Sequence, residues 1–144
     1  MATFLGNGVQ LSVATVDLSS YVKSVTLNQT FDTIDVSAMG ATGHSQIAGL
    51  ENSSVTIEFM ADFATSKVNQ TINGSGAGNG SVGGTVALKV VPAAGSVSAS
   101  NPLYTATCLV IEWPQVYNVT ELATISVTWP VNGGITKAIT GTFA

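Results

Sequence analysis

The sequence contains no arginine, and four lysines and one histidine are its only basic side chains. Charged residues make up 8% of its 144 residues, compared with roughly 25% in an ordinary soluble domain. Proteins that bind nucleic acids contact phosphates through clustered lysine and arginine side chains. The absence of such clusters and the net charge of −4 argue against nucleic-acid capture. A weakly negative surface would instead let DNA pass without adhering to it.

So little charge is unusual in a chain that is 45% apolar. Like-charge repulsion keeps soluble monomers apart, and a protein with little charge loses that protection. We interpret the composition as a sign that copies of the chain, or other partners, cover much of the surface. The alternative is that serine, threonine, asparagine and glycine supply enough surface polarity without any partner.

The chain has a single cysteine, Cys108, so no intramolecular disulfide can form. It lies in an apolar run, which predicts a buried thiol. The first ten residues lack a basic segment followed by a long apolar one, and no apolar run reaches the roughly 20 residues of a membrane span. We therefore expect no signal peptide, no membrane span and a cytoplasmic origin.

No catalytic or metal-binding constellation is visible. His44 is the only histidine, and a metal site needs several ligands at workable spacing. Asp32 and Asp35 fall on opposite faces of a strand, and Glu51 and Glu58 are too isolated to form an acid–base pair. We predict that the protein is not an enzyme and has no catalytic, cofactor-binding or metal-binding residues.

Alternating apolar and polar residues predict β-strands over much of the chain. The alternation occurs in residues 24–28, 33–37, 54–59, 85–90 and 123–129. Each strand should place one face on a core and leave the other mostly polar, as in antiparallel sheets. The run Tyr104 to Glu112 is apolar on both faces in its second half, which favours a central strand or a subunit contact.

One helix is expected at about 61–73, where apolar residues form a narrow stripe. Asp62 is its candidate N-cap. Three loops are expected at residues 40–50, 73–84 and 93–102; the second is rich in glycine. These elements predict a single, mostly β domain over residues 1–144, with two packed antiparallel sheets in a sandwich-like or barrel-like arrangement and one flanking helix.

The order of several segments resembles the tail tube (major tail) proteins of long-tailed phages. The segments are VDLSSYVKSVTLNQTFDTIDVSAMG (16–40), IAGLENSSVTIEFMADFATSKV (47–68), VVPAAGSVSASNPLYTATCLVIEWPQV (90–116) and ELATISVTWPVNGGITKA (121–138). The glycine-rich stretch 73–84 departs from the pattern of that family.

The resemblance implies a structural virion protein that self-assembles. In the family, six copies form a ring, the inner strands join into one barrel, and stacked rings build the conduit for the genome. Implied partners are further copies of the chain and other tail proteins, such as the tape measure, tail terminator and baseplate components. Double-stranded DNA would be a non-specific passing cargo. The implied location is the virion tail, assembled in the cytoplasm of the bacterial host.

Candidate residues for the self-assembly interface are Met39, His44, Gln46, Glu51 and Trp113. The loop 40–50 and the N-terminal segment are candidates for contacts between rings. Two alternatives remain open: a capsid decoration or head–tail completion protein with a related fold, and a β-sandwich module that binds glycans through Trp113.

Overall fold

The computed structural model describes residues 8–14, 16–61, 72 and 82–143. Its described part contains nine strands and one short 3-10 turn (Ser19–Tyr21). The strands are β1 (Gln10–Val13), β2 (Val16–Asp17), β3 (Val22–Asn28), β4 (Phe31–Asp35), β5 (Gln46–Glu51), β6 (Ser54–Met60), β7 (Thr85–Val91), β8 (Leu103–Leu109) and β9 (Thr124–Ala138). The expectation of a mostly β protein is confirmed.

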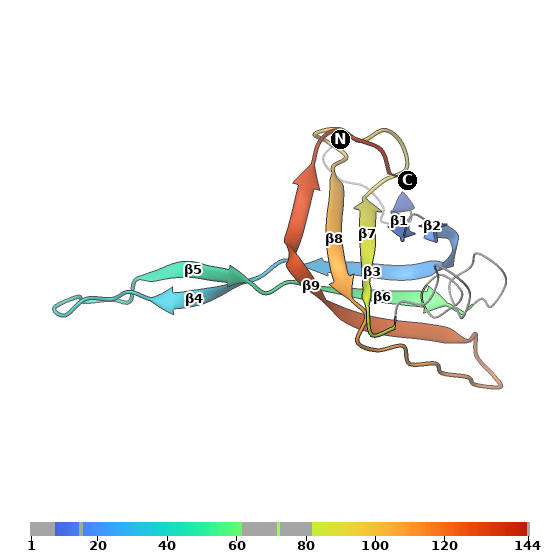
Figure 1. The fold of residues 1–144 in the computed structure, drawn as a ribbon, viewed down its shortest axis with the longest axis horizontal. Helices are drawn as coiled ribbons and strands as arrows, with labels where there is room; N and C mark the ends of the chain where they lie inside the picture. Colours follow the sequence, from blue (N-terminus) through green and yellow to red (C-terminus); the bar gives the residue numbers. More distant parts are fainter. Residues whose placement is uncertain (1–7, 15, 62–71, 73–81, 144) are drawn as a thin grey trace.

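Seven of these strands form one antiparallel sheet in the order β2-β1-β7-β8-β9-β6-β3, while β4 and β5 form a separate two-stranded sheet. The long strand β9 belongs to both halves of the larger sheet. Its residues 124–130 pair with β6, and its residues 131–138 pair with β8. The sheet therefore curls at β9, and β7 and β8 lie across β3 and β6 (Figure 1). The two predicted sheets are two halves of one continuous sheet.

The core lies between these two halves. In β6, Val55, Ile57 and Phe59 are fully buried and alternate with half-buried polar residues. The same alternation buries Val86, Leu88 and Val90 in β7 and the odd-numbered residues 125–129 of β9. Strand β8 is central, between β7 and β9, as one reading of the apolar run from Tyr104 predicted. Cys108 is buried, as expected, and burial raises the pKa of its thiol to about 11.

The predicted helix at about 61–73 lies almost entirely outside the described residues, and so does most of the glycine-rich stretch 73–84. Only Ala61 and Ile72 of the helix segment are described. Ile72 is fully buried in the core, and Ala61 is partly buried and packs against that core.

Two expectations for residues 31–51 are wrong. The predicted loop 40–50 is placed too far along the chain, because β5 begins at Gln46 and the connection between the two strands is residues 36–45. The apolar side chains of Ile34 and Val36 do not reach the core, since both are about half exposed. Alternation specifies that a strand has an apolar face, but it does not specify what covers that face.

Candidate self-assembly surface

Strands β4 and β5 form a hairpin that projects from the rest of the molecule, and we call residues 31–51 the arm (Figure 1). The remaining described residues are the body. All of residues 31–51 are described, and none of them is buried. An isolated two-stranded hairpin is at best marginally stable in water. Within the described residues, the arm thus lacks a second layer like the one that covers the core strands of the body.

One side of the arm is apolar. Ile34 and Ile47 are directly paired across the two strands, and Val36 lies on the same side, two residues beyond Ile34. Their exposed fractions are 50% for Ile34, 53% for Ile47 and 47% for Val36. Asp32 shares this side, because a Cβ placed on Gly49 would meet both the Asp32 Cβ and the Ile34 Cδ1 at 3.4 Å. We call Asp32, Ile34, Val36 and Ile47 the apolar side of the arm.

The opposite side of the arm is polar toward the tip, although Phe31, two residues before Thr33 on that side, is 51% exposed. The carboxylate of Asp35 accepts a hydrogen bond from the backbone N–H of Ser37 (2.9 Å) and lies 3.3 Å from His44 Nδ1. Hydrogen bonds from Ser37 and, to a smaller extent, from His44 lower the pKa of Asp35. Ser37 Oγ in turn accepts the backbone N–H of Ser45 at 2.7 Å. These contacts close the end of the hairpin just before its tip, where Met39 is fully exposed.

Glu51 joins the arm to the body. Its Oε2 accepts hydrogen bonds from the backbone N–H of Ile135 at 2.6 Å and from Ser53 Oγ at 2.7 Å. Its Oε1 accepts one from Gln29 Nε2 at 3.1 Å. These bonds lower the pKa of Glu51, with that from Gln29 contributing most. The carboxylate lies against Gly134, so closely that a Cβ at that position would be 2.6 Å from Oε2.

The outer face of β3, β6 and β9 is covered with hydroxyl groups. Thr26, Thr56 and Thr128 form one row across the three strands, and the hydroxyls of Thr56 and Thr128 are 3.2 Å apart. The next row contains Glu58, which lies 3.8 Å from Lys23 Nζ. This face is therefore polar and close to neutral, and β3 is one of the two edge strands of the sheet.

A second exposed apolar region lies in the connection between β8 and β9. Glu112 anchors this connection to β9, since its Oε1 accepts the backbone N–H of Thr128 at 2.8 Å and its backbone C=O accepts Trp129 Nε1–H at 3.1 Å. Several large side chains of the connection are exposed: Ile111, Val116, Tyr117, Val119 and Leu122.

Four of the five candidate interface residues lie on the arm. Met39 is at the tip, His44 is close to it, Gln46 begins β5, and Glu51 is at the base. Trp113 is separate from them: it is half-buried, and its ring stacks on that of Trp129 with a centroid distance of 6.4 Å and an interplanar angle of 26°.

The sequence reasoning missed the apolar side of the arm. It assigned Ile34 to the core and placed Ile47 in a loop. The available signal was the low charge of the chain, which already predicted that apolar surface is covered by partners.

Within the described residues, no group of three or more histidine, cysteine or acidic side chains is positioned to hold a metal ion. The helices there include none with the length and apolar character needed to cross a bilayer.

The curled sheet with its projecting hairpin is the fold of tail tube proteins. The chain superposes on the SPP1 tail tube protein with a TM-score of 0.73 at 12% identity, over 99% of this chain and 81% of that one. A chain from the virion of a native gene transfer agent particle gives a TM-score of 0.68 at 8% identity, over 94% of this chain and 99% of that one.

A chain from the tail of an empty gene transfer agent particle, refined with C6 symmetry, gives a TM-score of 0.63 at 11% identity, over 93% of this chain and 98% of that one. No protein family model and no curated protein sequence matches the chain. The resemblance to tail tube proteins inferred from the sequence segments is thus confirmed in three dimensions, at the level of the fold.

Proposed function

We propose that this chain is a structural protein of a virion tail, a single tail tube domain over residues 1–144. Its copies assemble into rings of six, and the rings stack into the tube through which the genome is delivered. Its partners are further copies of itself and the tail proteins that measure, terminate and anchor the tube. The double-stranded DNA is a passing cargo, and the tail is assembled in the host cytoplasm.

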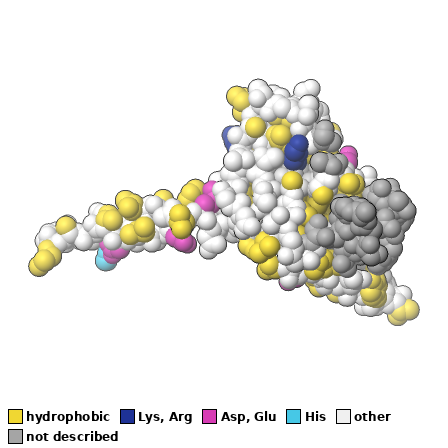
Figure 2. All heavy atoms as spheres, in the orientation of Figure 1, with side chains coloured by type: hydrophobic (Ala, Val, Ile, Leu, Met, Phe, Trp, Pro, Cys, Tyr) yellow, Lys and Arg dark blue, Asp and Glu magenta, His cyan; other side chains and the backbone are white. Residues whose placement is uncertain are grey.

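The main support for this proposal is the exposed apolar side of the arm. Its apolar side is about half exposed at Ile34, Val36 and Ile47, although such side chains gain about 1.5–3 kcal/mol each when fully buried. Contiguous exposed apolar surface on a soluble protein marks an interaction site. Because the arm points away from the body, a contact that buries its apolar side must come from another molecule (Figure 2).

The polar outer face of β3, β6 and β9 supports the proposal that the assembled chain encloses a channel. A face of hydroxyl groups is readily wetted, and its one lysine, Lys23, is close to the carboxylate of Glu58. The chain contains no arginine, which is the best phosphate ligand among side chains. Closure of the sheet between copies at edge strand β3 would also remove an edge that otherwise invites uncontrolled pairing. The number six rests on the C6 symmetry of the gene transfer agent tail.

The test is electron microscopy of the purified chain over a range of concentrations, together with sedimentation velocity. We expect rings or tubes with a central channel above a threshold concentration, and averaged end views with six-fold symmetry. A chain that stays monomeric at every concentration, and that antibodies fail to detect in purified virion tails, would contradict the proposal. Labelling confined to capsids would instead favour a decoration or completion protein.

A further inference from the structure

We propose that the apolar side of the arm docks onto the outer face of β7, β8 and the second half of β9 in a neighbouring copy. This inference rests on the proposed self-assembly and specifies where the arm binds. It pairs Asp32 of one copy with Lys89 of the next, and it places Ile34 over a shallow hollow beside that lysine.

The distribution of charge supports this pairing. Residues 29–53 contain three carboxylates, those of Asp32, Asp35 and Glu51, and no lysine. Residues 82–111 and 130–144 contain two lysines, Lys89 and Lys137, and no aspartate or glutamate, although Glu51 of the same copy lies against Gly134. Complementary charge of this kind steers association and fixes the register of an interface. Since Glu51 is bound to the body and Asp35 faces the polar side, Asp32 is the carboxylate of the apolar side.

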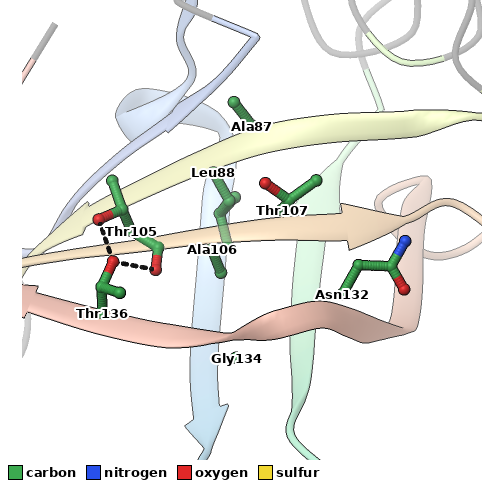
Figure 3. A pocket seen from close by; sticks show the side chains of 8 residues that line it. All are labelled: Ala87, Leu88, Thr105, Ala106, Thr107, Asn132, Gly134 and Thr136. Carbon is green, nitrogen blue, oxygen red and sulfur yellow. Dashed lines mark hydrogen bonds between the residues drawn. The ribbon is translucent and has the colours of Figure 1, made fainter.

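The hollow is created by a bulge in β9. Thr105 pairs with Thr136 and Thr107 pairs with Asn132, so residues 133–135 of β9 lie opposite Ala106 alone. The hollow has a volume of about 230 Å³, with the buried Leu88 and Ala106 among its lining residues. Apart from Leu88 and Asn132, its lining side chains are those of alanine and threonine, and Gly134 contributes none (Figure 3). The lining residues are Ala87, Leu88, Thr105, Ala106, Thr107, Asn132, Gly134 and Thr136.

The spacing of the two surfaces matches. Asp32 and Ile34 are two residues apart on one side of β4, which corresponds to about 7 Å along a strand. Lys89 and Ala87 are also two residues apart, on the outer side of β7, and Ala87 lines the hollow. Lys89 is directly opposite Thr105, whose hydroxyl lies 2.8 Å from that of Thr136. An arm strand laid along β7 can therefore place its carboxylate on Lys89 and its isoleucine over the hollow together.

The arm cannot make this contact with its own body, because it extends away from β7 and β8 (Figure 1). The occupant is consequently a second copy of the chain. A contact between two different surfaces of identical chains is heterologous, and such contacts propagate into rings or open stacks.

A charge exchange in the full-length chain tests the pairing. Asp32→Lys and Lys89→Asp should each raise the concentration at which half of the protein is assembled by about tenfold or more, since each places like charges together. The combined variant Asp32→Lys/Lys89→Asp should recover assembly to within about threefold of the parent chain. The matched control is the double variant Asp35→Lys/Lys137→Asp, in which Asp35 lies on the polar side of the arm. Combining these two substitutions should not restore assembly relative to either single variant.

A bulky side chain tests the hollow. Thr107→Trp should block assembly, whereas Ser126→Trp on the outer face of β9 beside β6 should leave the docking surface open. If the parent chain assembles and the Asp32, Lys89 and Thr107 variants assemble equally well, the docking inference is wrong and the proposed function stands. If the combined variant assembles no better than the single ones, the pairing is also wrong. A parent chain that never assembles contradicts the proposed function and the inference together.

Discussion

In the body of this protein the apolar side chains of each strand face a second layer of the same chain, whereas in the arm they face solvent. Val55, Ile57 and Phe59 of β6 are 0% exposed, but Ile34 of β4 is 50% exposed. Both strands have the alternating pattern typical of a sheet with one covered face. The core strands of the body therefore find their covering layer within one copy, whereas the arm depends on a covering layer from outside it.

The body and the arm are also stabilised by different interactions. The body gains its free energy of folding from buried side chains, of which Trp129 is the largest. The arm is held by its backbone ladder and by Glu51 at its base. We therefore expect substitutions in the body to change folding and substitutions in the arm to change assembly.

The largest expected effect is in the body. Trp129→Ala removes the largest fully buried side chain and its ring contacts with Phe59 and Trp113. It should lower the free energy of unfolding by about 3–5 kcal/mol. The measurement is urea denaturation followed by far-ultraviolet circular dichroism, at concentrations where the chain is monomeric. Phe31→Ala, an aromatic truncation in the arm, should stay within about 0.5 kcal/mol of the parent chain. Similar losses in the two variants would remove the distinction between body and arm.

The next effect lies at the junction of the two regions. Gly133 and Gly134 have φ values of +81° and +97°, and a non-glycine residue there costs about 1–3 kcal/mol. A Cβ at Gly133 meets nothing within 4 Å, but at Gly134 it would be 2.6 Å from Glu51 Oε2. Gly134→Ala should therefore destabilise the chain by more than Gly133→Ala does. Equal losses in urea denaturation would show that the Glu51 contact contributes nothing.

The sequence predicted β3, β6, β7, β8 and the first half of β9, because their pattern and their covering layer are in the same chain. It did not predict β1 or the second half of β9. The curl of the sheet could not be predicted, because it depends on which strands β9 pairs with along its length. The hydrogen bond between Glu51 and Ile135 also could not be predicted from local sequence patterns, since the two residues are 84 positions apart in the sequence.

For the candidate site, four of the five predicted residues fall on the arm, yet the side that we propose binds was missed. Ile34 was assigned to the core because every alternating strand was assumed to have its partner layer within the copy. Trp113, the fifth candidate, lies apart from the arm, with its ring stacked on that of Trp129. The exposed position of Ile34 could not be found without the fold in three dimensions.

Substitutions on the apolar side of the arm should have a smaller effect on folding but a large effect on assembly. Ile34→Ser/Ile47→Ser should change the free energy of unfolding by less than about 0.5 kcal/mol per site. It should raise the concentration for half assembly by at least about tenfold, which equals 1.4 kcal/mol. Ile139→Ser is the matched control, because Ile139 is 54% exposed on the body. Sedimentation velocity distinguishes the variants, and normal assembly of the double variant would show that the arm is not the interface.

The smallest expected effect is a contribution of Glu51 to the pH dependence of folding stability, which should be absent when Glu51 is replaced. The hydrogen bonds from Gln29, Ser53 and Ile135 lower the pKa of Glu51 in the folded chain. The unfolded chain therefore binds the Glu51 proton more readily than the folded chain does. The resulting stabilisation is present above the ordinary glutamate pKa of 4.5 and is lost as the pH falls through the lowered value.

Glu51→Gln removes this contribution, because a glutamine does not titrate. The stability difference between the parent chain and Glu51→Gln should therefore shrink as the pH is lowered from about 7 to about 3. Urea denaturation at each pH measures it, and Glu58→Gln, which removes the same charge from the outer face of β6, should leave the Glu51 contribution in place. A difference that stays constant with pH would mean that the arm is joined to the body without its carboxylate.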